Sequence, residues 1–377
     1  MTPFSILCST EIQFGAGTHR RLLDMVPKGP VLLVKGASNA ASAPVRTVLD
    51  AAGVPYETVE CGSEPSIKSV NVTWQAVQST RFSALIACGG GSVIDTGKAL
   101  LVAMHKGAPL TDEDFAKTHT TLGDLPLIVL PTTAGTGSEV TANAVLGAAQ
   151  SAAKISLRGS GLQPKTAIID PDMMQSAPKH VVLYSGLDAV VQNIEAYTSA
   201  KATPFTRALA GPAVASTLTA LKDVITTNSP EAWSRLAWGS VSSGIALANG
   251  GLGAVHGLAS ILGAAVPAPH GALCGRLLVP VMRANLASNL CTSDIRRDIM
   301  MCQTAITDLF APFDAQNPYS GFEAWLGAQN LPRLAEWGVQ DDQIMQLAEA
   351  SVTASSSLKN PVKLTASELA QVLRAAL

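Results

Sequence analysis

Residues 84–98 read ALIACGGGSVIDTGK. A short apolar run leads into three glycines and then into a helical pattern, which predicts a buried strand, a tight turn and a helix. Glycines let a ligand approach the backbone, and the free N–H groups at a helix start favour an anion, so the turn is suited to a pyrophosphate. A tight turn between a strand and a helix that binds nothing has the same sequence signature.

The same design recurs on both sides of this stretch, in residues 29–36 and 126–138. Alternation of short apolar runs with helical patterns predicts βαβ units and a parallel sheet. Strands are expected at 31–34, 84–87, 127–130 and 167–169, and helices at 41–52 and 93–104. The hydroxyl-rich turn TTAGTGSE (132–139) favours a nucleotide site beside the glycine turn, with a solvated loop as the alternative.

The character of the sequence changes after about residue 176, where Ala- and Leu-rich helical patterns replace the strand signals. We therefore predict an α/β domain over residues 1–177 and an all-helical domain over 178–377. The helices are expected at 183–199, 207–227, 231–249, 341–355 and 369–377.

The composition narrows the class of protein. Hydrophobic residues make up 47% of the 377 residues, charged residues 14%, and the net charge is −2, which argues against nucleic-acid binding. The six cysteines lack CxxC spacing and no signal peptide is evident, so a cytoplasmic protein with reduced thiols is expected. The uncharged run 236–275 is broken by Ser, Asn, Gly and Pro, which favours buried helices over a membrane span.

Two of the six histidines, His256 and His270, lie in that uncharged run. Asp188, in GLDAVVQNIE (186–195), is read as lying in an early turn of a helix, where it could also be a cap. One carboxylate and two imidazoles form a ligand set that suits catalytic zinc or ferrous iron, whereas the alternative is that the histidines are hydrogen-bonded core residues.

These motifs together resemble the iron-dependent (group III) alcohol dehydrogenase family. The resemblance extends over nearly the whole chain in the right order. It includes FGAG (14–17), GGGSVIDTGKAL (89–100), PTTAGTGSEVT (131–141), the pair Lys154-Ile155, AIIDPDMM (167–174), GLDAVVQNIEAYTS (186–199), ALANGGLGAVHGLA (246–259), PHG (269–271) and Asn360-Pro361.

The resemblance implies an N-terminal α/β dinucleotide-binding domain with a parallel sheet and an all-α C-terminal metal-binding domain, the fold shared with dehydroquinate synthase. The active site would lie in the cleft between the domains. Metal ligands would be Asp188, His256 and His270, which are also the catalytic residues, with Gln192 as a weaker candidate ligand. The cofactor site would be formed by Gly36, Ser38, Gly89, Gly90, Gly91, Ser92, Asp95, Thr132, Thr133, Thr136, Thr141 and Lys154. A homodimer is also implied.

Two positions depart from the family pattern. The family usually has His four residues after the ligand Asp, where this chain has Gln192, and often has His four residues after the helical ligand His, where it has Ser260. An amide oxygen is a weak ligand compared with imidazole, so the metal could be zinc rather than iron. No carboxylate follows the strand at 31–34, and Lys35 and Ser38 are nearby, which mildly favours NADP over NAD.

The expected activity is reversible hydride transfer between a nicotinamide and a small alcohol or aldehyde, assisted by a metal ion acting as Lewis acid. The main alternative is a carbonyl or enoate reductase resembling maleylacetate reductase, which requires no metal. Less favoured are a lyase resembling dehydroquinate synthase, which needs cationic side chains that 236–275 lacks, and a binding protein without catalysis. No membrane or nucleic-acid partner is expected.

Overall fold

The computed structural model describes residues 3–62, 64–148 and 154–377, and it divides into two compact units. One unit comprises residues 7–178 and 229–237, and the other comprises 1–6, 179–228 and 238–377. A parallel sheet with helices forms the first unit and helices form the second, so the predicted fold class is confirmed.

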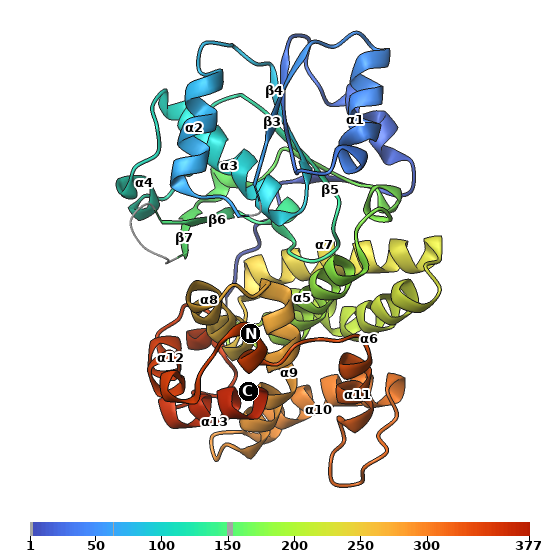
Figure 1. The fold of residues 1–377 in the computed structure, drawn as a ribbon, viewed down its shortest axis with the longest axis vertical. Helices are drawn as coiled ribbons and strands as arrows, with labels where there is room; N and C mark the ends of the chain where they lie inside the picture. The colour runs from blue at the N-terminus through green and yellow to red at the C-terminus, as the bar shows by residue number, and fades with distance from the viewer. Residues whose placement is uncertain (1–2, 63, 149–153) are drawn as a thin grey trace. The chain divides into compact units, whose positions relative to one another are not determined.

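The α/β unit is built on a six-stranded parallel sheet with the strand order β1-β8-β5-β4-β2-β3. Figure 1 labels β3, β4 and β5 of this sheet, with α1 on one side of them and α2 and α3 on the other. The four predicted strands are confirmed as the four inner strands. The sheet strands are β1 (Glu11–Phe14), β2 (Val31–Lys35), β3 (Tyr56–Glu60), β4 (Ala84–Gly89), β5 (Leu127–Pro131) and β8 (Thr166–Ile169).

The inner strands are apolar on both faces because helices cover the sheet on both sides, as parallel sheets require. Every residue of β2, β4, β5 and β8 is buried, whereas the edge strand β3 carries exposed residues. The helices of this unit are α1 (Asn39–Ala51), α2 (Ile67–Val77), α3 (Gly91–Lys106) and α4 (Asp112–Ala116), with an antiparallel hairpin formed by β6 (Asn143–Gly147) and β7 (Lys154–Arg158).

The helical unit begins with α5, directly after Pro178. Its helices are α5 (Lys179–Thr198), α6 (Pro204–Thr226), α7 (Pro230–Gly250), α8 (Ala254–Ala265), α9 (His270–Ala287), α10 (Ser293–Leu309), α11 (Ser320–Ala328), α12 (Ile344–Val352) and α13 (Ala366–Ala376). The first turns of α7 belong to the α/β unit. The predicted helix at 341–355 is shorter than expected, because a 3-10 turn occupies Asp341–Gln343 and the α-helix ends at Val352.

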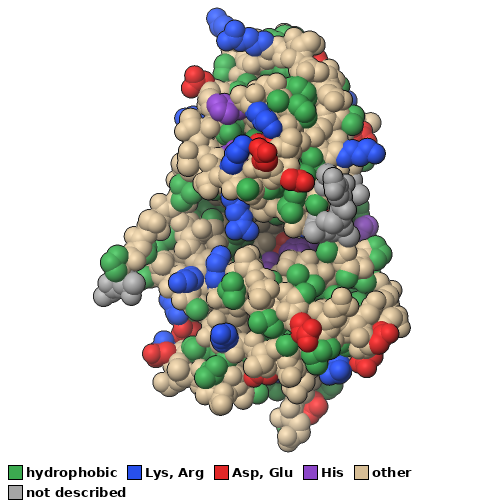
Figure 2. Space-filling model, turned by 90° about the vertical axis from the view of Figure 1, so that its left-hand side faces the viewer, with side chains coloured by type: hydrophobic (Ala, Val, Ile, Leu, Met, Phe, Trp, Pro, Cys, Tyr) green, Lys and Arg blue, Asp and Glu red, His purple; other side chains and the backbone are tan. Residues whose placement is uncertain are grey.

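Helix α6 is long and apolar enough to cross a membrane by length and composition, with a mean hydropathy of 1.2 in its most apolar window. Helices α7 and α8 reach the same threshold only as a pair, and they meet at a bend of 99°. A core helix of a globular protein meets this criterion as well, and 44% of the α6 window is buried. Lys, Arg, Asp and Glu side chains all occur on the face shown in Figure 2, in keeping with the net charge of −2.

Candidate metal centre and nucleotide-binding turns

The glycine turn joins β4 to α3 as the sequence predicts. Gly90 is the N-cap of α3 and has no side chain to cap the helix, and Gly90, Gly91 and Ser92 are half-buried. The free N–H groups of the first turn of α3 can therefore bind an anion, and the helix dipole favours negative charge there.

The glycine turn packs against the hydroxyl-rich turn that follows β5. A Cβ atom on Gly90 would lie 3.2 Å from Thr133 Oγ1, and one on Gly91 would lie 2.7 Å from Thr136 Cγ2. The two turns are adjacent because β4 and β5 are neighbouring parallel strands, so their carboxyl ends meet at one edge of the sheet. Side chains at these glycines would collide with the threonines. The predicted residues Gly89–Ser92, Thr132, Thr133 and Thr136 are therefore brought together.

Asp95 and Thr141 have internal partners instead. Asp95 accepts hydrogen bonds from Ser138 Oγ (2.6 Å) and Val145 N (3.0 Å), and burial raises its pKa. The Thr141 carbonyl accepts a hydrogen bond of 2.8 Å from Lys98 Nζ, which is fully buried. These contacts fasten α3 to the segment that follows β5, a structural role that the sequence motif alone did not reveal.

The remaining predicted cofactor residues lie at other positions of the α/β unit. Ser38 caps α1, accepting a hydrogen bond of 3.3 Å from Ala41 N. Lys154 Nζ lies 2.9 Å from Glu64 Oε1. Lys35 is buried at the end of β2, and its Nζ lies 2.8 Å from Glu60 Oε2, at the end of the neighbouring strand β3. A carboxylate is thus present beside Lys35, although it comes from a different strand.

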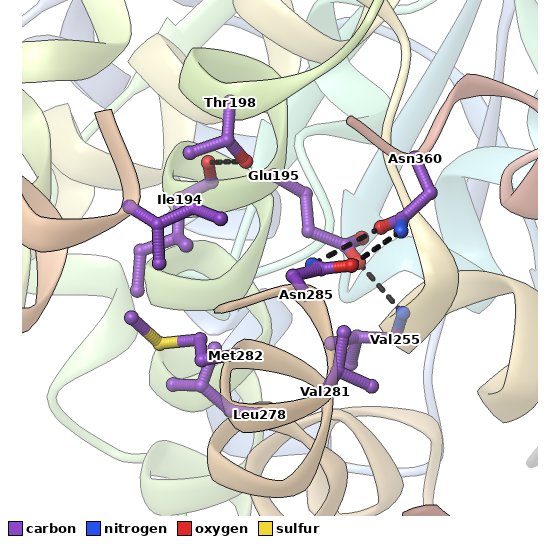
Figure 3. Close-up of a pocket in the computed structure, with 10 residues that line it drawn as sticks. Ile194, Glu195, Thr198, Val255, Leu278, Val281, Met282, Asn285 and Asn360 are labelled. Carbon is purple, nitrogen blue, oxygen red and sulfur yellow. Dashed lines mark hydrogen bonds between the residues drawn. The ribbon is translucent and has the colours of Figure 1, made fainter. Parts of the chain in front are cut away.

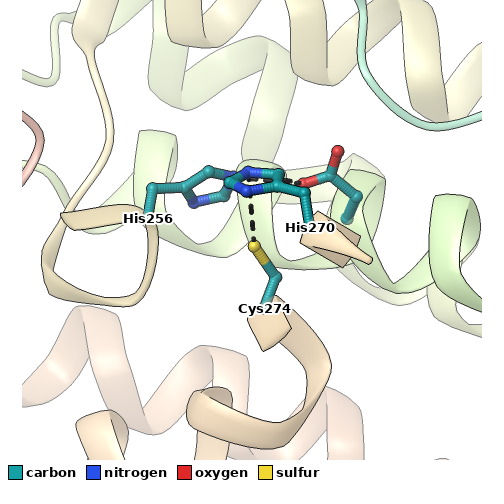
Figure 4. Close-up of side chains that lie close together, drawn as sticks. His256, His270 and Cys274 are labelled. Carbon is teal, nitrogen blue, oxygen red and sulfur yellow. Dashed lines mark hydrogen bonds and ion pairs between the residues drawn. The ribbon is translucent and has the colours of Figure 1, made fainter. Parts of the chain in front are cut away.

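The three predicted metal ligands converge in the helical unit. His256 Nε2 lies 3.1 Å from Asp188 Oδ1, and His270 Nε2 lies 3.9 Å from the same oxygen. Figure 4 shows the two imidazoles side by side, with ring centroids 5.4 Å apart. Asp188 and His256 are buried, and the His270 side chain is 39% exposed. The cluster is therefore largely buried, and His270 is its most exposed member.

Cys274 is a fourth donor in this cluster, which sequence reasoning missed. One donor atom each from Asp188, His256, His270 and Cys274 lies within 4.8 Å of all the others. Cys274 Sγ lies 3.7 Å from His270 Nε2 (Figure 4). The spacing of four residues between His270 and Cys274 was the available signal, because residues i and i+4 share one face of a helix.

Each predicted ligand lies on a different helix. Asp188 lies well inside α5, which starts at Lys179, so its prediction as an early-turn residue is wrong and a capping role is excluded. His256 lies in the first turn of α8. His270 is the first residue of α9, after Pro269, as the two prolines that end the preceding segment indicated.

Glu195, two turns beyond Asp188 on α5, holds the helix that carries His256. Its Oε2 lies 2.6 Å from His256 Nδ1, and its Oε1 accepts a hydrogen bond of 2.7 Å from Val255 N. Asn360 Oδ1 accepts another from Ala254 N (3.0 Å). Because Gly253 has no side chain to cap α8, these two remote residues satisfy the helix start. The carboxylate also fixes the His256 ring, leaving Nε2 directed at Asp188.

The space behind Glu195 is filled by side chains. A cavity of about 10 Å³ lies there, lined by the residues drawn in Figure 3. Asn285 and Asn360 face one another across it, and Asn360 Nδ2 donates a hydrogen bond of 2.7 Å to Asn285 Oδ1. A cavity of this size holds about one water molecule, so it serves the packing of the helix start and is too small for a substrate.

The ionisable groups in the cluster shift one another's pKa values. Burial alone would lower the pKa of His256, but Cys274, Asp188 and Glu195 raise it well above its usual value. Burial alone would raise the pKa of Cys274, but the two imidazoles lower it. Burial would likewise raise the pKa of Asp188, but His256 and His270 lower it. Anionic and cationic forms favour one another here, as expected of closely spaced groups of opposite charge.

The chemistry of this donor set fits a divalent transition-metal ion. Imidazole, thiolate and carboxylate are the ligands that zinc takes from proteins, and imidazole and carboxylate also bind ferrous iron. Gln192 is buried, and its Oε1 accepts a hydrogen bond of 2.7 Å from Ser243 Oγ. Ser260 is exposed, and its Oγ donates to Gly257 O (2.8 Å).

Comparison with known proteins places these features in one family. Residues 9–171 match the family described as iron-containing alcohol dehydrogenase, and residues 182–377 match the C-terminal domain of the Fe-containing alcohol dehydrogenase family. The chain is 31% identical to the 1,3-propanediol dehydrogenase of Citrobacter freundii, over 84% of this chain and 82% of that protein.

Two further relatives extend the comparison. The probable alcohol dehydrogenase EutG of Escherichia coli is 37% identical over 59% of this chain, and the match spans 56% of EutG, little more than half its length. The iron-containing alcohol dehydrogenase of Thermococcus thioreducens has the same fold, with a TM-score of 0.85 and 26% identity over 99% of both chains. The chain therefore belongs to the iron-containing alcohol dehydrogenase family.

Proposed function

We propose that the protein is an NAD(P)-dependent, metal-assisted alcohol dehydrogenase or aldehyde reductase that acts on a small alcohol or aldehyde. The observation that carries the proposal is the convergence of the Asp188 carboxylate with the His256 and His270 imidazoles. Family membership and the relatives named alcohol dehydrogenases support the same reaction class.

Each residue of the cluster has a defined task in this proposal. Asp188, His256 and His270 would hold a divalent ion, and Glu195 would act as a positioning residue through its 2.6 Å contact with His256 Nδ1. An ion bound there would supply Lewis-acid chemistry, polarising a carbonyl oxygen in reduction or lowering the pKa of an alcohol in oxidation. The exposed part of His270 gives a small substrate access to this centre.

The glycine turn of the α/β unit is the proposed binding site for the cofactor pyrophosphate. The first N–H groups of α3 and the hydroxyls of Thr133 and Thr136 supply the donors for it. In the sequence, the positive charge of Lys35 favours NADP over NAD. The Glu60 carboxylate pairs with Lys35 and offsets that charge. Both NAD and NADP therefore remain in the proposal, and the hydride chemistry is that of the nicotinamide.

The proposal also covers the cellular compartment, the oligomeric state and the partners of the protein. The six cysteines are all unpaired, which supports a reducing compartment such as the cytoplasm. A homodimer is proposed from the family resemblance, and light scattering of the purified protein tests it. No observation on the described residues favours a membrane or nucleic-acid partner.

The decisive test combines metal analysis with turnover. The purified protein is assayed for iron and zinc, and NADH and NADPH oxidation is screened over short aldehydes. Asp188→Ala and His256→Ala are expected to lose bound metal and turnover, while NADH binding, followed by nicotinamide fluorescence, is unchanged. Full turnover and metal content in both variants would refute the metal role. Full activity after chelation of the wild-type protein would favour the metal-optional carbonyl or enoate reductase.

A further inference from the structure

We propose that the Cys274 thiolate is a metal ligand, which completes a four-donor protein site selective for zinc. The other three donors are the carboxylate and the two imidazoles described above. The inference rests on the proposed function in one respect, namely that a divalent ion occupies this cluster.

Three of the six separations between the donor atoms are close to the edges of a zinc tetrahedron, and all six are within 4.8 Å. Zinc bonds of about 2.0–2.1 Å to nitrogen or oxygen and about 2.3 Å to sulfur place tetrahedral donors about 3.3–3.6 Å apart. The observed separations are 3.1 Å between Asp188 Oδ1 and His256 Nε2, 3.9 Å between that oxygen and His270 Nε2, and 3.7 Å between His270 Nε2 and Cys274 Sγ. A single ion can therefore reach all four donors once the longer separations close to tetrahedral values.

Close packing of α9 on α5 brings the thiol to this position. A Cβ atom on Gly271 would lie 2.0 Å from the Tyr184 carbonyl oxygen and 3.1 Å from Asp188 Cβ, and one on Gly275 would lie 2.5 Å from Leu187 Cδ1. These two glycines flank the face that carries His270 and Cys274. The absence of their side chains lets that face approach the carboxylate of α5 directly.

The charge of the site favours a thiolate in it. A divalent ion bound by the Asp188 carboxylate and neutral imidazoles leaves one positive charge on the ion and its direct ligands, which favours the thiolate form of a nearby cysteine. A thiolate brings the total charge of ion and ligands to zero. The cysteine also supplies the donor that Gln192 fills poorly, since the amide oxygen is a weak ligand and already accepts a hydrogen bond from Ser243.

The metal identity follows from the chemistry of the donors. Thiolate ligands select softer ions, and a tetrahedral set that includes sulfur and imidazole nitrogen is typical of zinc. Zinc can expand to five ligands, so a substrate oxygen still has room to approach at the exposed His270 side. The proposal thus assigns zinc to a chain whose family is named after iron.

The test uses spectroscopy on the metal-loaded, full-length protein. Cobalt(II) is exchanged into the wild type, Cys274→Ser and a matched control, Cys302→Ala, whose thiol is buried in α10 of the same unit. The wild type and the control are expected to show the sulfur-to-cobalt charge-transfer band in the near ultraviolet. Cys274→Ser is expected to lose it and to bind zinc at least about 10-fold more weakly, by chelator competition.

X-ray absorption at the zinc edge of the wild type needs no variant and covers the case in which Cys274→Ser fails to fold. A sulfur shell at about 2.3 Å supports the assignment, and a shell of nitrogen and oxygen alone overturns it. Failure of the proposed function gives a different result. A zinc-loaded wild type with the sulfur shell but no turnover over the aldehyde panel refutes the dehydrogenase and keeps the ligand. Turnover with identical cobalt spectra in wild type and Cys274→Ser refutes the ligand and keeps the dehydrogenase.

Discussion

The side chain of Glu195 performs two tasks with its two oxygens. One oxygen binds the backbone at the start of α8, and the other lies against the His256 ring. A carboxylate in this position fixes which imidazole nitrogen is free for a metal and increases the basicity of the ring. In the proposed metal centre, the orientation of His256 therefore depends on a residue outside the set of ligands.

We expect Glu195→Gln to weaken metal binding about 10- to 100-fold, because the amide cannot support His256 as the carboxylate does. Metal affinity is measured by chelator competition. NADH binding should stay at the wild-type level, since the α/β unit is unchanged. Glu349→Gln, an exposed position on α12, serves as the control and should behave as wild type. Equal metal affinity in wild type and Glu195→Gln would contradict the positioning role.

A second residue-level prediction concerns the choice between NAD and NADP. The Glu60 carboxylate pairs with Lys35, and a negative charge there would repel a 2′-phosphate. We expect Glu60→Gln to raise the ratio of kcat/KM for NADPH over NADH several-fold, which corresponds to about 1 kcal/mol. Lys35→Met should lower the same ratio. If neither substitution changes the ratio, this pair lies outside the region that reads the 2′ position.

At the scale of elements, the glycine turn depends on the space between β4 and β5. A Cβ on Gly91 would meet Thr136 at 2.7 Å. We expect Gly91→Ala to destabilise the α/β unit by about 1–3 kcal/mol and to raise the KM for the nicotinamide cofactor. The control is Gly62→Ala, where nothing lies within 4 Å of the new Cβ. An unchanged KM in Gly91→Ala would show that the turn does not hold the cofactor.

The sequence indicates the inner elements of the fold well and the outer ones poorly. The buried strands β2, β4, β5 and β8 are continuous apolar runs, which periodicity detects directly. The edge strand β3 reads YETVE and carries exposed polar residues, so it gives no apolar run and was not predicted. The same is true of β1, whose residues are half-buried or exposed, and of the hairpin β6–β7, whose strands mix buried, half-buried and exposed residues.

The candidate site likewise has some residues that the sequence indicates and others that only the packing of helices brings together. Asp188, His256 and His270 could be found because their residue types and surroundings match a ligand set and a family motif. Cys274 lies outside any CxxC motif, and the spacing of the six cysteines does not distinguish it from the others. The fold does, because α9 places Cys274 one turn from His270 and among the other donors. Long-range contacts such as Glu195 with Val255 depend on packing and have no local signature.

At the scale of the whole molecule, the buried Lys98 contributes to the stability of the fold. Its Nζ donates hydrogen bonds to the carbonyls of Ser138, Thr141 and Asn143, at 2.6 to 2.8 Å. Burial lowers its pKa to about 8, although Asp95 and Glu139 oppose the shift. The ammonium group therefore matches three acceptors while it remains costly to bury.

We expect Lys98→Met to lower the free energy of unfolding by about 3 kcal/mol or more, because three carbonyls lose their donor. The pH dependence has a definite sign. Above pH 8 the folded state loses the Lys98 proton, whereas the lysine of the unfolded chain keeps its proton up to about pH 10.5. Unfolding therefore takes up a proton between pH 8 and 10.5. For this reason Lys98 makes the free energy of unfolding rise with pH in that range. Urea unfolding at pH 7 to 10 should show this contribution in the wild type and not in Lys98→Met.

His270 differs from the other donors in that its side chain is 39% exposed while Asp188 and His256 are buried. In the proposed metal site, His270 would thus be the ligand that solvent reaches, and an ion would enter and leave past this imidazole at the start of α9. A substitution at His270 is then expected to change the rate of metal exchange as well as the affinity, because the other two ligands are buried.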